Sequence, residues 1–146
     1  MSEALNSKPS MSFWVIATVV LLWNLIGLMI YYMQVTMTPE VMAENFNEAQ
    51  QAWMINEPAW ATAAYATAVT AGVIGAVLML LRKALALPLF ILSFIAVLVQ
   101  DFNAFVLSDW KSVWGTSALY LPSVVIIICI FEIWYTRSAK AKGWLS

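Results

Sequence analysis

Four apolar stretches, each about as long as a membrane is thick, constrain this chain more than any other feature of its sequence. They cover about residues 12–34, 59–81, 85–107 and 115–135. A helix needs about 20 residues to cross a hydrocarbon core of roughly 30 Å. Because backbone groups in lipid must find hydrogen bonds within their own segment, each stretch is predicted to be a helix. We therefore expect an all-α membrane protein, an up-down bundle of four transmembrane helices.

The composition agrees with this class and excludes several others. Hydrophobic residues make up 63% of the 146 residues and charged residues 10%, whereas soluble domains carry about 25% charged residues. A chain this short cannot bury so much apolar surface by itself, so the lipid bilayer is the expected partner. A net charge of −1 gives a nucleic-acid partner no support. With no histidine, no CxxC and no nucleophile or phosphate-binding motif, the sequence predicts no metal, no cofactor and no enzymatic activity.

The lysines and arginines predict how the bundle is oriented. With four crossings, six of the seven fall on one side: Lys8, Arg82, Lys83, Arg137, Lys140 and Lys142. Such residues are enriched on the cytoplasmic side of membrane helices. We expect both termini to be cytoplasmic, with residues 1–11 as an N-terminal segment, 12–136 as the membrane domain and 137–146 as a basic tail.

The first outer loop carries a helix signal of its own. Thr38 suits a helix cap, Pro39 the first helical position and Glu40 the positive end of the helix dipole. Apolar residues then recur at helical spacing, and Pro58 follows. This pattern predicts one short amphipathic helix over residues 39–55, lying on the outer membrane surface or capping the bundle.

The second stretch contains a ladder of small residues. Its members recur every four residues in two overlapping series and include Ala64, Ala68, Gly72, Gly75 and Ala76. Small residues allow helix backbones to approach closely in lipid. The ladder predicts either packing inside this bundle or an interface with a second copy or another membrane protein.

Polar residues within the apolar stretches are the candidates for contact with a solute. Asn24 lies in the middle of the first stretch, and Gln100, Asp101 and Asn103 lie near the outer end of the third. A buried amide needs a partner, so Asn24 could equally form an interhelical hydrogen bond. The group around Asp101 could be a solvated cluster or a shallow outward-facing site.

Glu132 lies about one turn before the predicted inner end of the fourth stretch. Arg137 and Arg82 are expected at the same level, so the sequence predicts an ion pair at the inner face. The alternative is a carboxyl group that exchanges protons during transport.

Five segments taken together resemble a known group of proteins: LLWNLIGL, MQVTMTPE, NEPAWATAAYA, RKALALPLFILSFIAVLVQDF and AKGWL. The group consists of small bacterial four-helix inner-membrane proteins, often described as sugar transporters, with an architecture similar to DoxX-like proteins. The resemblance extends from Phe13 to Leu145. It implies a location in the bacterial inner membrane, and it brings no catalytic motif and no functional residue.

Two functions follow from these observations. The first is a non-enzymatic membrane subunit or accessory protein that assembles through helix packing. The alternative is a transporter of a small polar solute such as a sugar. A water-accessible cavity containing Asn24 would favour transport, whereas a dry core with the small residues facing outward would favour assembly.

Overall fold

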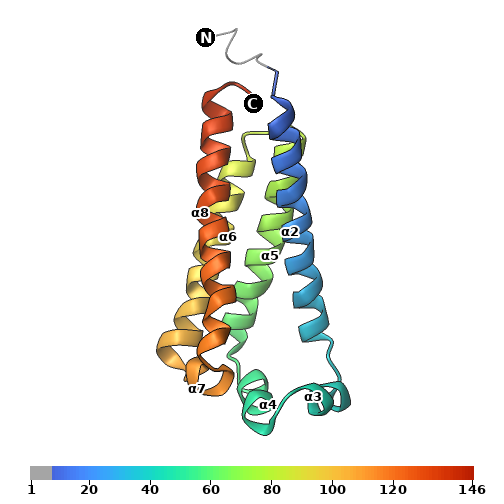
Figure 1. Ribbon diagram of the computed structural model, residues 1–146, viewed down its shortest axis with the longest axis vertical. Coiled ribbons are helices and arrows are strands. Elements are labelled where there is room, and N and C mark those ends of the chain that lie inside the picture. The colour runs from blue at the N-terminus through green and yellow to red at the C-terminus, as the bar shows by residue number, and fades with distance from the viewer. Residues whose placement is uncertain (1–7) are drawn as a thin grey trace.

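The four predicted membrane helices are present and form one bundle. The computed structural model describes residues 8–146 and has no strand in that range, so most of the predicted N-terminal segment lies outside the described residues. The long helices are α2 (Met11–Val35), α5 (Ala59–Leu80), α6 (Ala86–Phe102) and α8 (Tyr120–Ala141). They run alternately in opposite directions, and the two ends of the described chain, residues 8 and 146, lie at one end of the bundle (Figure 1). All four spans are long and apolar enough to cross a membrane, which confirms the predicted fold class.

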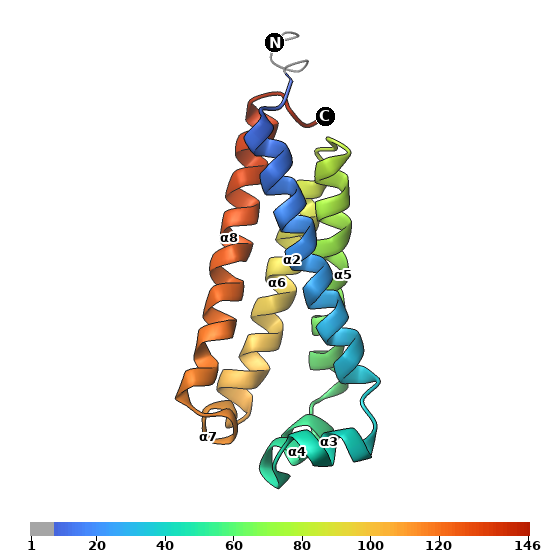
Figure 2. The ribbon, with the colours of Figure 1, turned by 45° about the vertical axis from the view of Figure 1, so that its right-hand side comes forward.

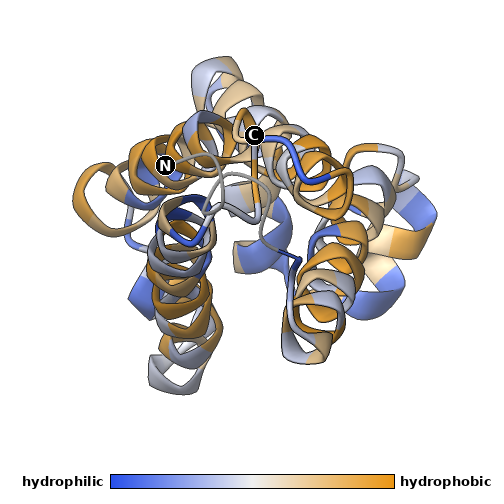
Figure 3. Ribbon diagram, turned by 90° about the horizontal axis from the view of Figure 1, so that it is seen from above, coloured by the Kyte–Doolittle hydropathy of each residue, from blue (hydrophilic) through white to orange (hydrophobic). Residues whose placement is uncertain are grey.

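The helices pack in chain order, α2 against α5, α5 against α6 and α6 against α8. In Figure 2, α8 lies on the left with α6 beside it, and α2 lies in front of α5 on the right. Side chains join α2 and α8 at the end that carries the termini, where the Phe13 and Tyr135 rings stack with centroids 6.4 Å apart. Viewed along the bundle, apolar residues cover most of the long helices (Figure 3). Many face outward, including Val19 and Ile127, which are 58% and 65% exposed. Lipid is the medium that such a surface requires.

The α-helix of the fourth span, α8, begins and ends later than predicted. Gly115 has a φ of +85° and ends a short helix, α7 (Trp110–Trp114), and a 3₁₀ turn, η2 (Thr116–Leu119), precedes α8. Pro122 then falls in the first turn of α8, where proline removes no helical hydrogen bond. At the other end α8 continues to Ala141 rather than to residue 135, with Arg137 exposed on its surface.

Residues 137–146, which were predicted as a basic tail, continue α8 as far as Ala141 and then fold back onto the bundle. The chain turns back after α8, and Leu145 becomes buried with 2% exposure. The backbone N–H of Ser146 donates to the carbonyl of Arg82 in the α5–α6 turn, at 3.0 Å. The Lys142 ammonium lies 4.7 Å from the centre of the Trp144 ring. The tail therefore closes this end of the bundle.

The outer helix is broken into two, α3 (Pro39–Asn45) and α4 (Glu48–Ile55). The reason is a second cap within the predicted helix. The Asn47 side chain accepts from the backbone N–H of Gln50 at 2.8 Å, and the Gln50 side chain accepts from that of Asn47 at 3.1 Å. This reciprocal pair starts a new helix. Both short helices lie at the end of the bundle opposite the termini (Figure 1).

Candidate functional site

Four residues, one from each long helix, meet in the middle of the bundle: Asn24 of α2, Gly72 of α5, Ser93 of α6 and Glu132 of α8. All four are buried, with Asn24 at 9% exposure, Ser93 at 7% and Glu132 at 4%. The Asn24 amide nitrogen donates to one carboxyl oxygen of Glu132 at 3.0 Å. The same nitrogen donates to the carbonyl of Val20 at 2.8 Å. These two bonds hold the amide against Glu132 from a fixed position on α2. We call Asn24, Gly72, Ser93 and Glu132 the central site.

Gly72 makes room for the Asn24 side chain. A Cβ atom at residue 72 would lie 3.1 Å from Cγ of Asn24 and would clash with its Oδ1. It would also lie 3.5 Å from the hydroxyl of Ser93. Any other residue at position 72 would therefore push the Asn24 amide away from α5.

The two hydroxyl groups nearby are occupied by backbone carbonyls. The Ser93 hydroxyl donates to the carbonyl of Ala68 at 2.7 Å, which ties α6 to α5. The Thr136 hydroxyl donates to the carbonyl of Glu132, one turn earlier in α8. Both hydroxyl groups donate their protons to backbone carbonyls and not to the Glu132 carboxyl. Within the described range, the side chain that donates to this carboxyl is the Asn24 amide.

The predicted ion pair of Glu132 with Arg137 or Arg82 is not formed. The exposed Arg137 does not reach the buried carboxyl, and the Arg82 guanidinium donates to the carbonyl of Trp144 at 2.9 Å. The error arose from the end of the helix. Because α8 continues to Ala141, Glu132 lies about 14 Å from that end, at about 1.5 Å per residue, and not one turn from it. Glu132 is thus a mid-depth residue in the fourth span.

Apolar layers close the central site on both sides. Towards the termini lies a large cluster that includes Phe13, Met79 and Phe90. Towards the opposite end lies a thinner cluster of four small or medium residues: Ala68, Ala96, Val97 and Cys129. The carboxyl and amide groups are therefore shielded from both ends of the bundle, and less material lies on the side away from the termini.

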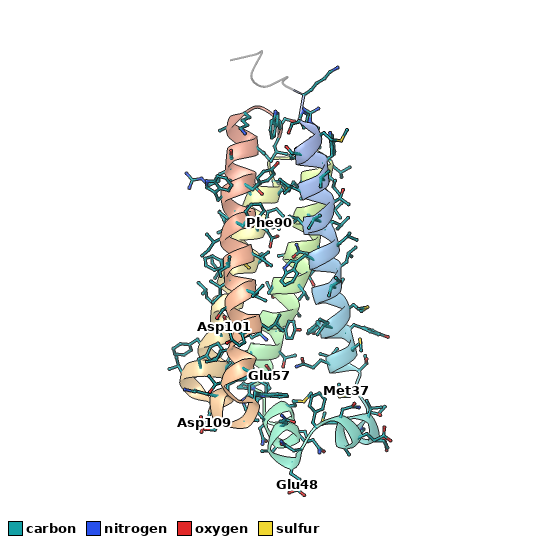
Figure 4. All side chains as sticks on the ribbon, in the orientation of Figure 1. Met37, Glu48, Glu57, Phe90, Asp101 and Asp109 are labelled. Atoms are coloured by element: carbon teal, nitrogen blue, oxygen red, sulfur yellow. The ribbon has the colours of Figure 1, made fainter. Side chains whose placement is uncertain are left out.

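The four predicted solute-contacting residues do not form one site. Asn24 belongs to the central site, whereas Gln100 is half-buried on α6, nearer the end opposite the termini. Asp101 has one carboxyl oxygen that is buried and has no hydrogen-bond partner within residues 8–146. Asn103 is 4% exposed and lines a cleft near α4. Figure 4 shows Asp101 well below Phe90, towards the cap helices.

The small-residue ladder is turned inward. The exposed fractions of Ala64, Ala68 and Ala76 are 9%, 6% and 0%, and Gly72 and Gly75 are also buried. A Cβ atom at Gly75 would lie 3.1 Å from the Phe90 ring of α6. The ladder is therefore an internal packing surface, and the alternative of an outward interface on α5 is wrong. The structure matches neither of the two arrangements expected above, since Asn24 is buried and the small residues also face the core.

Glu132 was predicted as an inner-face residue, but its contact with Asn24 was missed. Its partner Asn24 lies 108 positions away, so no local pattern could connect them. One signal was available. Glu132 and Asp101 are the acidic residues inside the four apolar spans, and an ionisable residue there is a functional candidate by default.

The geometry defines a multi-pass membrane protein with a closed polar centre. Within the described residues no group of three potential metal-ligating side chains occurs. Comparisons with protein-family models, with curated proteins and with solved structures find no match.

Proposed function

We propose that the protein transports a small polar solute across the membrane and that the central site binds this solute. The observation that carries the proposal is the Glu132 carboxyl, 4% exposed and hydrogen-bonded to Asn24 in the middle of four apolar helices. An acidic group at this depth is costly to keep. Apolar residues of similar size would pack the bundle at least as well. Packing therefore gives no reason for an acidic residue at position 132, whereas binding of a solute does.

The pair offers both kinds of hydrogen-bonding group. The carboxyl accepts hydrogen bonds, and the amide donates them and can accept through its oxygen. A solute that carries hydroxyl groups could replace the Asn24–Glu132 bond with bonds of its own. A sugar meets this requirement, in keeping with the resemblance of the sequence to proteins described as sugar transporters.

The apolar layers support an alternating mechanism with a closed intermediate. In the present arrangement the site is closed at both ends. We call the thinner cluster, which includes Ala96 and Cys129, the thin layer, and the large cluster, which includes Phe13 and Phe90, the aromatic layer. We expect the thin layer to open more readily, because fewer contacts must be broken. The half-buried Asp101 lies beyond the thin layer and would be the next polar group that an entering solute meets.

We further propose that the protein lies in the bacterial inner membrane with both termini in the cytoplasm. The side bias of the lysines and arginines supports this orientation, and the two ends of the described chain lie at the same end of the bundle (Figure 1). The thin layer would then face the periplasm. Labelling of Lys142 by an impermeant amine reagent added to intact cells with a permeabilised outer membrane would contradict this orientation.

The direct test is solute flux in proteoliposomes. The purified protein should take up at least one compound from a panel of labelled sugars and small polar organic solutes. Glu132→Gln should lower the initial rate by about tenfold or more, since it replaces a carboxyl oxygen by an amide donor. Glu44→Gln, on the exposed surface of α3, is the matched control and should leave the rate unchanged.

Two results would refute the proposal. The first is the absence of protein-dependent flux for the entire panel. The second is equal flux for Glu132→Gln and the unaltered protein. Equal melting temperatures of the variant and the control are required, so that a lost rate reports on the site rather than on folding.

A non-enzymatic subunit or accessory role remains the second candidate, on a different surface from the one predicted. Because the α5 ladder is internal, assembly would have to use another surface of the bundle. Only 11% of the apolar part of the fourth span is buried inside the bundle, so the outer face of α8 is available for contact with another protein. Native mass spectrometry after extraction in mild detergent should then show a complex. A monomer without bound protein would count against this role.

A further inference from the structure

A cleft at the end of the bundle opposite the termini lies outside the central site. Its volume is about 500 Å³, and it lies between α4, the start of α5, and the segment of residues 103–113 that follows α6. Seven of its lining residues carry polar or aromatic side chains: Trp53, Asn56, Glu57, Trp60, Asn103, Ser108 and Asp109. We call these seven residues the outer cleft.

The outer cleft is built by a local change in helix geometry. After Phe102, α6 continues as a π-helix, η1 (Asn103–Leu107), which ends at Ser108. The wider turn is closed by Ser108, whose hydroxyl donates to the carbonyl of Asn103 at 2.8 Å. The Trp53 indole of α4 donates to that same hydroxyl at 3.1 Å. These bonds fix one aromatic wall of the cleft against the end of α6. Short π-helical segments of this kind are frequent at functional sites.

Asn103 is the most deeply buried polar residue of the cleft. Its exposed fraction is 4%, and its side chain makes no hydrogen bond within the described part of the chain. The fully buried side-chain atoms without a partner in the described residues are Asp101 Oδ2 and Trp114 Nε1, so the amide atoms of Asn103 reach the open space of the cleft. The backbone carbonyl of Asn103 accepts hydrogen bonds from both the hydroxyl and the backbone N–H of Ser108, so it is the Asn103 side chain that lacks a partner in the described range. A ligand in the cleft would supply the missing partner.

The charge of the cleft selects the class of ligand. Two acidic side chains, Glu57 and Asp109, line it, and among residues 8–146 neither a lysine nor an arginine does. Glu57 is half-buried and accepts a hydrogen bond from Thr62 at 3.1 Å. Figure 4 shows Glu57 and Asp109 at the same end of the bundle. Carboxylates together with two indole rings favour a cation, which gains from both charge pairing and the ring faces.

We infer that the outer cleft binds a small organic cation with an ammonium group. The carboxylates of Glu57 and Asp109 neutralise the charge, Trp53 and Trp60 contact its alkyl groups, and the Asn103 amide oxygen accepts a hydrogen bond from an N–H or hydroxyl of the ligand. The cleft is distinct from the central site, which lies beyond the thin apolar layer. Binding here does not require transport.

Equilibrium dialysis of labelled choline tests the inference. The full-length protein is held in a polyoxyethylene detergent, which carries neither charge nor sugar. Choline should bind in a saturable manner. Its neutral carbon analogue, 3,3-dimethyl-1-butanol, should fail to displace it. Asp109→Asn should weaken choline binding by about tenfold, which corresponds to about 1.4 kcal/mol. Because Asp109 is exposed, this variant should fold normally.

The matched control is Glu48→Gln on α4. It removes the same charge at an exposed position, and Figure 4 shows Glu48 at the far tip of the cap, away from Glu57 and Asp109. Its choline affinity should equal that of the unaltered protein. Glycerophosphocholine, added as a second ligand, distinguishes a lipid headgroup from a free cation. Binding of either one, sensitive to Asp109→Asn, supports the ammonium site.

Three results would overturn the inference: no saturable choline binding, equal displacement by the neutral analogue, or an equal loss of binding in Glu48→Gln and Asp109→Asn. Displacement by glucose without any effect of Asp109→Asn would instead show a polyol site. None of these results depends on flux, so they leave the proposed transport function to its own test.

Discussion

The substitution Gly72→Ala examines the central site through its most crowded contact. The added Cβ atom would lie 3.1 Å from Cγ of Asn24 and would clash with its Oδ1, so the amide must move. Asn24 is held by its bonds to Val20 and Glu132. Displacing it leaves a buried carboxyl oxygen without its donor, at a cost of about 1–3 kcal/mol.

Gly27→Ala provides the reference for this cost. A Cβ atom at residue 27 would meet only Cγ1 of Val69, at an ordinary 3.7 Å. Both glycines lie within long helices, where alanine is favoured over glycine by about 1 kcal/mol. That gain is common to the two variants and cancels in the comparison. Gly72→Ala should therefore be less stable than Gly27→Ala by about 1–3 kcal/mol, the cost of the lost hydrogen bond.

Reversible unfolding in mixed micelles, followed by circular dichroism, measures this difference. A double-mutant cycle then shows whether Asn24 is the cause. In an Asn24→Ala background there is no amide to displace, so Gly72→Ala should no longer destabilise the protein. The reasoning is refuted if Gly72→Ala and Gly27→Ala are equally stable, or if the cost of Gly72→Ala persists without the Asn24 amide.

Three further predictions concern the core, the cap and the pH dependence. Phe90→Ala should lower the free energy of unfolding by about 3–5 kcal/mol, because Phe90 is 2% exposed within the large buried cluster. Phe102→Ala, on an outward face with 51% exposure, should change it by about 0.5 kcal/mol. Similar losses in the two variants would contradict this packing. Asn47→Ala removes the cap of α4 and should destabilise that helix by about 1 kcal/mol. The backbone amides of α4 should then exchange hydrogen faster. Unchanged exchange would argue against the break in the outer helix. Burial raises the pKa of Glu57 above its ordinary value of 4.5, although the Thr62 hydrogen bond opposes the shift. The folded state thus holds this proton more tightly than the unfolded chain, so the stabilisation is full below pH 4.5 and is lost as the pH rises through the folded-state value. Glu57→Gln should flatten that part of the curve of stability against pH, and an unaltered curve would contradict it.

The spans could be predicted from sequence, but their ends were less accurate. An apolar run of sufficient length forms a helix in lipid whatever its neighbours are, because the backbone must satisfy itself. The ends depend on more. Arg137 suggested that the fourth span stops at residue 135, yet an exposed arginine at a helix end needs no break in the helix. The break at Asn47 was readable in principle, since Asn47 and Gln50 have the spacing of a capping box.

The sequence by itself determined the class of protein, the four helices and the list of costly polar residues, because apolarity and charge are properties of each segment. Only the tertiary structure decided which of those residues meet. Asn24 and Glu132 are 108 positions apart, and their contact depends on how far α8 extends and on the space that Gly72 leaves. The direction of the small-residue face was decided in the same way, since Ala64 and Ala68 pack equally well against a helix of this chain or of another. A helix pattern shows which residues share a face, whereas the partner of that face is set by the packing of all four helices together.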